Sequence, residues 1–212
     1  MEFSNFLNQV SKVKKIALDG EKAHLEMLSG DRKPLKINEI EKRNPLKAGV
    51  MALFYPNQAH ETMLILILRK TYKGVHSGQI GFPGGKKENV DHSMQDTALR
   101  ETYEEIGVRP SSISVCRQLT KVYIPPSNFW VYPFLGITEV HPKFKRQESE
   151  VEELLPVKLE DILDDSKIVT RKFPTPSGKE FEAPGFLFGD KVVWGATGMM
   201  LNEVKVLLQH IL

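Results

Sequence analysis

The sequence has a single cysteine, no long apolar run and almost no excess of charge of either sign. Cys116 alone cannot form an intramolecular disulfide, and cysteine and histidine with the spacing of a zinc site are absent. A formal net charge of +2 over 212 residues gives no reason to expect nucleic acid or a membrane surface as a partner. Since no apolar run approaches a membrane span and the polar N-terminus lacks a signal-peptide pattern, we expect a cytoplasmic soluble protein.

Residues 1–44 carry no chemical signal, whereas the remainder of the chain is long enough to bury one substantial core. Apolar residues recur at helical spacing from about residue 2 to residue 15, which predicts an amphipathic helix. Residues 17–44 are polar and broken by glycine and proline, and we expect an irregular lead-in with short strands. We therefore expect an N-terminal helix and lead-in, residues 1–44, packed on a domain of residues 45–212. The helix could also support a homodimer.

Strand-forming runs dominate the first half of residues 45–212. They predict strands at residues 48–55, 63–68, 112–122 and 129–137. The run at 63–68 is continuously apolar, as in a strand that is covered on both faces. Residues 143–153 pass from basic to acidic, which is typical of an exposed loop. Residues 170–193 are punctuated by glycine and proline and could form a hairpin over a site. These patterns indicate an α/β protein with helices packed on a mixed sheet.

The chemically informative stretch runs from Gln79 to Val108. A glycine- and proline-rich turn leads through a polar loop into a predicted helix of about residues 93–106. Glu101, Glu104 and Glu105 are spaced i, i+3 and i+4, so they share one helix face and repel each other. A hard cation with oxygen ligands would remove that repulsion. A solvated acidic face is the alternative reading of this spacing.

The ends and the buried side of this helix can also be predicted. Asp91 or Ser93 can cap its first turn, because each offers an oxygen to free backbone N–H groups. Gly107 can supply the left-handed residue that ends it. Leu99, Tyr103 and Ile106 fall toward another side of the helix and can anchor it to the core.

The segment Arg100-Glu-Thr-Tyr-Glu-Glu-Ile-Gly-Val108, preceded by Gly85, resembles the Nudix box. This resemblance implies a Nudix-type α/β/α sandwich with a mixed β-sheet and a loop–helix–loop catalytic motif. It also implies a Nudix pyrophosphohydrolase that uses Mg²⁺ or Mn²⁺ and a small-molecule nucleotide substrate.

A second resemblance is to the branch of Nudix enzymes that cleave coenzyme A. It rests on His76-Ser-Gly-Gln-Ile-Gly-Phe-Pro-Gly-Gly85, on the placing of Asp91 six residues after the glycine, and on similar segments at 131–136 and 194–198. Lys70 and Met199 stand where that branch has arginine. The resemblance implies hydrolysis of the diphosphate link of coenzyme A or its thioesters, giving phosphopantetheine (or its acyl form) and adenosine 3′,5′-bisphosphate.

These patterns assign roles to individual residues. The expected metal ligands are Glu101, Glu104, Glu105 and Gly85. The expected catalytic residues are Arg100, which would support the carboxylates, and either Glu104 or Glu150 as the general base, with Glu148 as a substitute for Glu150. The expected substrate-binding residues are Arg69, Lys70, His76, Gln79 and Gly84. Hydrolysis of another nucleoside diphosphate derivative, such as ADP-ribose or NADH, is the alternative activity, and a non-catalytic nucleotide-binding domain is the alternative class.

Overall fold

A computed structural model describes residues 1–28, 35–71, 78–174 and 180–212. The helices are α1 Phe3–Val10, α2 Gly20–Glu26, α3 Ile37–Glu41, α4 Met94–Ile106, α5 Leu159–Leu163 and α6 Gly195–Gln209, with short 3₁₀ turns at Ser11–Lys15, Pro110–Ser112 and Asp165–Lys167. The strands are β1 Leu46–Pro56, β2 Thr62–Arg69, β3 Ile80–Gly81, β4 Gly84–Lys86, β5 Ser114–Gln118, β6 Val122–Ile124, β7 Phe129–Ile137, β8 Val151–Lys158, β9 Ile168–Pro174, β10 Glu180–Phe188 and β11 Lys191–Trp194.

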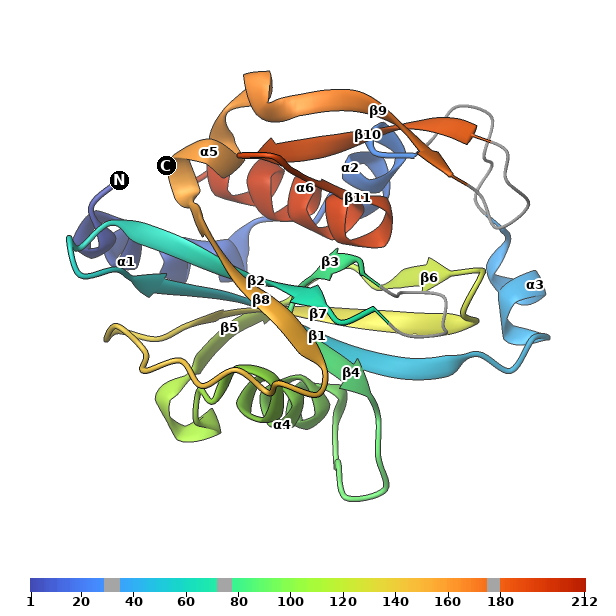
Figure 1. The fold of residues 1–212 in the computed structure, drawn as a ribbon, viewed down its shortest axis with the longest axis horizontal. Helices are drawn as coiled ribbons and strands as arrows, with labels where there is room; N and C mark the ends of the chain where they lie inside the picture. Colours follow the sequence, from blue (N-terminus) through green and yellow to red (C-terminus); the bar gives the residue numbers. More distant parts are fainter. Residues whose placement is uncertain (29–34, 72–77, 175–179) are drawn as a thin grey trace.

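An eight-stranded mixed sheet forms the centre of the molecule, between α4 on one face and α6 on the other (Figure 1). Its main path is β3-β2-β1-β7-β5, and β4, β6 and β8 pair onto it. The β1–β7 pair is parallel, while the other pairs are antiparallel. The α/β/α sandwich expected from the sequence is therefore confirmed.

The central strand β2 is covered on both faces, as its unbroken apolar run predicts. Leu64 and Leu66 belong to the core on the α6 side, and Ile65 and Ile67 belong to the core under α4. This division follows from the period of two in a strand, where successive side chains point to opposite faces.

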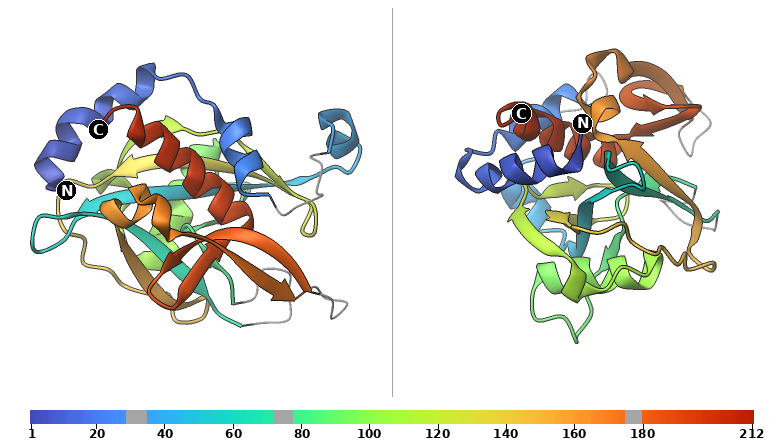
Figure 2. Two further views of the ribbon diagram at one scale, coloured as in Figure 1. Left: turned by 90° about the horizontal axis from the view of Figure 1, so that it is seen from above. Right: turned by 90° about the vertical axis from the view of Figure 1, so that its left-hand side faces the viewer.

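A three-stranded antiparallel sheet, β9-β10-β11, lies beside α6 (Figure 2). β9 and β10 form the hairpin that the sequence suggested between residues 170 and 193. The rings of Phe173 and Trp194 stack at 4.1 Å between centroids, which holds the outer strands together over β10. This small sheet extends the layer that covers the central sheet on the α6 side.

The lead-in differs from the expectation, because its described part forms the short helices α2 and α3 instead of strands. Contacts with α6 stabilise helix α2. The Asn202 side chain donates to the Ala23 carbonyl at 2.8 Å, and His24 lies 3.1 Å from the buried carboxylate of Glu203. The expected helix at residues 2–15 is present as α1 and a 3₁₀ turn. We propose that residues 1–44 form a cover that packs on a catalytic domain of residues 45–212.

The charged segment 143–153, expected to be an exposed loop, is a mostly exposed loop through residue 150, and only residues 151–153 differ because they begin strand β8. Val151 is fully buried, and β8 pairs with β2 along its length. Backbone pairing and alternate buried residues outweigh the local charge pattern here, since charges can point to the solvent side of a strand. Within the described ranges, no helix is long and apolar enough to cross a membrane.

Candidate active site

Helix α4 begins and ends as the sequence predicts. The Ser93 hydroxyl accepts from the Asp96 backbone N–H at 3.1 Å, and the Asp96 carboxylate accepts from the Ser93 N–H at 2.9 Å. This reciprocal pair is a capping box, so Ser93 is the capping residue of the two candidates. At the other end Gly107 has φ 77°, and its N–H donates to the Tyr103 carbonyl at 2.9 Å.

The buried face of α4 is rotated slightly from the one expected. Ala98 and Ile106 are fully buried against the sheet, whereas Tyr103 is 50% exposed, so its predicted anchoring role is wrong. Helix α4 also approaches β1 closely at Gly49. A β-carbon at Gly49 would lie 2.4 Å from the Met94 carbonyl oxygen. The helix therefore lies too close to β1 there for any larger residue.

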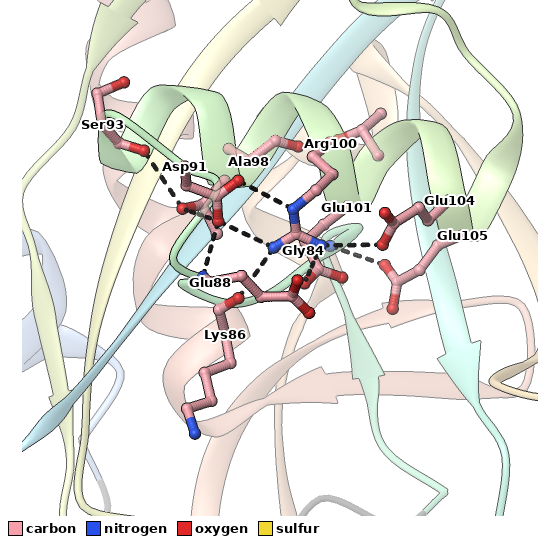
Figure 3. Close-up of polar contacts among 12 residues, drawn as sticks. Gly84, Lys86, Glu88, Asp91, Ser93, Ala98, Arg100, Glu101, Glu104 and Glu105 are labelled. Carbon is pink, nitrogen blue, oxygen red and sulfur yellow. Dashed lines mark hydrogen bonds and ion pairs between the residues drawn. The ribbon is translucent and has the colours of Figure 1, made fainter.

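Asp91 anchors the arginine of the acidic helix (Figure 3). The Nε and Nη2 atoms of Arg100 donate to its two carboxylate oxygens at 2.9 and 3.0 Å. The Thr97 hydroxyl and the Glu88 backbone N–H also donate to it, at 2.9 and 2.8 Å. Led by the bonds from Arg100, these donors hold the pKa of Asp91 well below its usual range.

Arg100 in turn orients two of the box glutamates. Its Nη1 lies 3.0 Å from Glu101 Oε1 and donates to Glu104 Oε2 at 2.9 Å. Its Nη2 also donates to the Lys86 carbonyl at 3.0 Å, which ties the helix to the last residue of β4. A planar guanidinium can hold several acceptors at fixed angles, so Arg100 fixes where these carboxylates point.

Glu105 is the buried member of the acidic face, with 1% exposure. Its Oε2 accepts from the Gly84 N–H at 2.7 Å, and its Oε1 lies 3.4 Å from the Arg69 guanidinium. Burial raises the pKa of Glu105 to about 7, although Arg69 and the Gly84 N–H act against that rise. A bound cation would favour the charged form of this buried carboxylate.

Gly85 makes room for the carboxylate of Glu101. A β-carbon at Gly85 would lie 2.4 Å from Glu101 Cδ and 2.5 Å from both of its oxygens. The side chain of Glu101 is largely covered, and this burial raises its pKa. The glycine therefore allows bare backbone and a carboxylate to face the same point.

The loop that carries Glu150 is held beside the acidic helix by backbone bonds, and Glu150 itself is exposed. The Gln147 N–H donates to the Glu105 carbonyl at 2.9 Å, and the Glu150 carbonyl accepts from the Lys70 N–H at 2.8 Å. Burial is the main cause of the raised pKa values of Glu101 and Glu105, and the negative charge of Glu150 adds to both shifts. Glu104 is 51% exposed on its side chain and stands at the rim of that region.

The donor set fits a divalent cation. Nearby carboxylates raise each other's pKa values, and hard cations prefer such oxygen ligands. Across the described part of the chain, no three acidic, histidine or cysteine side chains yet converge on one point. Ion pairs with Arg100 and Arg69 hold Glu101, Glu104 and Glu105 in their positions. These three glutamates and the Gly85 backbone are the residues that could hold the ion.

The expected substrate-binding residues lie on the strand and turn beside this acidic face. Gln79 accepts a hydrogen bond from the Arg69 N–H at 3.0 Å through its backbone carbonyl. Lys70 follows β2 with a half-buried side chain, and Gly84 opens β4. His76 lies outside the described residues.

Sequence reasoning missed the bond between Asp91 and Arg100. The sequence predicts Asp91 as a candidate helix cap and as a position shared with the coenzyme A branch, and neither role implies a bond with Arg100. An available signal was the presence of two candidate caps for one helix, which left one acid without a role.

A mixed sheet between helices, with a glycine turn facing a carboxylate-bearing helix, defines the protein as an α/β/α sandwich with an acidic site on one helix. Residues 45–175 match the NUDIX domain model. An "Uncharacterized Nudix hydrolase NudL" of Pectobacterium atrosepticum is 31% identical over 73% of this chain and 80% of that protein. The human "Mitochondrial coenzyme A diphosphatase NUDT8" is 29% identical over 77% of this chain and 70% of that protein.

Two solved structures share the fold. A Nudix hydrolase of M. smegmatis, RenU, has a TM-score of 0.54 at 12% identity and covers 79% of this chain and 88% of that one. A MutT/nudix family protein of Enterococcus faecalis has a TM-score of 0.52 at 18% identity and covers 92% and 76%. The chain belongs to the Nudix family and is a Nudix hydrolase. Nudix hydrolases act on small nucleotide substrates and generally use divalent metal ions.

Proposed function

We propose that this protein hydrolyses the diphosphate link of coenzyme A or its thioesters, giving phosphopantetheine (or its acyl form) and adenosine 3′,5′-bisphosphate. The substrate assignment is supported by the upstream segment of residues 76–85 and by the similarity to a human protein named as a coenzyme A diphosphatase. The observation that carries the chemistry is the buried Glu105 carboxylate, bonded to the Gly84 N–H beside Glu101 and Glu150.

Hydrolysis of a diphosphate must overcome its negative charge, which repels the attacking oxygen. A divalent cation held by Glu101, Glu105, the Gly85 backbone and Glu104 would neutralise that charge and activate water. Arg100 keeps Glu101 and Glu104 in place for this purpose. Lys70, His76 and Gln79 would contact the phosphate, and Gly84, the other residue expected to bind it, would stand beside it with its N–H bonded to Glu105.

The reaction also needs a base that removes a proton from the attacking water. Glu150 and Glu104 are the two candidates. Glu150 influences both buried glutamates and is free of the ion pair with Arg100 that engages Glu104. We therefore assign the role of general base to Glu150, with Glu104 as the alternative.

Lys70 and Met199 support one competing activity. Arginine stands at both places in the enzymes that cleave coenzyme A, and its loss here weakens the planar grip on phosphate. Another nucleoside diphosphate derivative, such as ADP-ribose or NADH, is the substrate in that case. A non-catalytic nucleotide-binding role is disfavoured by the presence of all three box glutamates.

The test is hydrolysis of coenzyme A, acetyl-coenzyme A, ADP-ribose and NADH with Mg²⁺ or Mn²⁺, with products separated by anion-exchange chromatography. Adenosine 3′,5′-bisphosphate from coenzyme A, with slower turnover of the other two nucleotides, is the expected result. Preferred cleavage of ADP-ribose or NADH would replace the substrate assignment. Glu105→Gln should abolish turnover while circular dichroism stays unchanged, and unaltered turnover in this variant would refute the site.

A further inference from the structure

The strand β2 aims Arg69 at the acidic helix. Ile65 and Ile67 lie in the core under α4, and side chains two residues apart share a face of a strand. The register between β2 and β8 shifts after Leu68, because Leu68 pairs with Glu153 and Arg69 with Val151. The extra residue belongs to β8, so the alternation along β2 continues to Arg69. Lys70 follows directly after the end of β2.

Arg69 and Glu105 hold the two sides of one peptide turn. The Arg69 Nη2 donates to the Gly84 carbonyl, and the Gly84 N–H donates to Glu105 Oε2 at 2.7 Å. Arg69 and Glu105 also contact each other directly, since Arg69 Nη2 lies 3.4 Å from Glu105 Oε1. Three elements that are distant in the sequence, β2, β4 and α4, are joined in this way.

Glu105 needs this partner, since a carboxylate that is almost completely buried is costly without a neighbouring positive charge. Arg69 supplies that charge, and it is itself only one-quarter exposed. Gly84 has φ 153°, and a β-carbon there would lie 2.4 Å from the Gly49 carbonyl oxygen. The turn therefore cannot be rebuilt with another residue, and its position depends on the groups that bond to it.

We propose that Arg69 is a positioning residue that holds Glu105 against the Gly84 turn, rather than a residue that binds the substrate. Its effect on turnover rests on the proposed function, while its effect on the fold does not. This role leaves Lys70 as the residue of this basic pair that would bind the phosphate.

A thermal double-mutant cycle tests the link between Arg69 and Glu105 without any substrate. The variants are Arg69→Met, Glu105→Gln and the pair, each melted in EDTA. Arg69→Met should lower Tm by about 5 °C in the wild-type background, because it leaves a buried carboxylate without its partner. In the Glu105→Gln background the drop should be at most about 2 °C. Equal drops in both backgrounds would overturn the proposal. Should Arg69→Met not fold, the same cycle with Arg69→Lys decides it.

Kinetics with coenzyme A separate positioning from binding. Arg69→Met should lower kcat by about tenfold or more and leave KM within about twofold, because misplacing a reacting group affects the transition state. The matched variant Lys70→Met should raise KM and keep its Tm. A raised KM with unchanged kcat in Arg69→Met would overturn the proposal. Absence of hydrolysis in the wild-type protein would refute the proposed substrate, and the thermal cycle would still decide the role of Arg69.

Discussion

Arg100 grips Asp91 through two hydrogen bonds, from Nε at 2.9 Å and from Nη2 at 3.0 Å, across nine residues of sequence. A two-point bond of this kind fixes the plane of the guanidinium. Its remaining nitrogen, Nη1, then meets Glu101 and Glu104 at a set angle. The loop before α4 thus determines where two glutamates of the acidic face point.

Asp91→Asn should destabilise the protein at neutral pH more than at acid pH. Its bond with Arg100 keeps the pKa of Asp91 low in the folded state, so the stabilisation is present above the unfolded value near 4 and is lost as the pH falls through the folded value. We expect a loss of about 2 kcal/mol in the free energy of unfolding at pH 7, since the pair is only partly open to water. Urea unfolding at pH 7 and pH 3 measures it, and equal losses at the two pH values would contradict it.

Gly85→Ala should impair catalysis with little effect on folding. The new β-carbon would overlap the Glu101 carboxylate, which must then turn out of its position. We expect kcat to fall by about tenfold or more, because a displaced carboxylate misplaces the charge that it should hold. Gly81→Ala is the matched control, since its β-carbon would meet only Thr197 and Arg69 at 3.8 and 3.9 Å. Equal activity of the two variants would contradict this role of Gly85.

Local patterns predicted much of this fold, and they did so where a single physical cause dominates. The continuous apolar run of β2 reflects burial on both faces, and the residues of β7 coincide with the predicted strand at 129–137. The caps of α4 follow from backbone groups that need partners at a helix end. The acidic face was found from spacing alone, since helix geometry fixes which residues are neighbours.

The remaining features depend on contacts between distant segments. Tyr103 was expected to be buried, but it is half exposed, because Ala98 and Ile106 form the side of the helix that packs on the sheet. Helix α2 packs against the buried Asn202 and Glu203 of α6. No local pattern in residues 17–44 predicts these contacts. The bond between Asp91 and Arg100 likewise forms only because the loop before α4 folds back onto that helix.

Glu150→Gln and Glu104→Gln should separate the two candidates for the general base. A positioned base contributes about a hundredfold or more to rate, so we expect a loss of that size in kcat for Glu150→Gln. Glu104 is half exposed and bonded to Arg100, and its replacement should cost about tenfold at most. A larger loss in Glu104→Gln would reverse the assignment.

Phe144 anchors the loop that carries Glu150, although it lies six residues away from it. Its ring meets Tyr55 edge-on at 5.1 Å and His141 at 6.3 Å. Just after it, the Lys145 N–H donates to the Ile106 carbonyl at 3.0 Å, so the loop is fixed to the last turn of α4. The loop has no regular structure of its own, and these contacts determine its path.

Phe144→Ala should therefore reduce turnover through Glu150. Loss of a partly buried aromatic ring should cost about 2 kcal/mol in the free energy of unfolding, and the freed loop should lower kcat by about tenfold. In a Glu150→Gln background the same substitution should lower kcat no further, because the group that it positions is already gone. Phe144→Leu should restore part of the activity, and Val140→Ala, at an exposed position of the same loop, should leave activity unchanged. If Phe144→Ala lowers kcat equally in both backgrounds, the loop acts on some group other than Glu150.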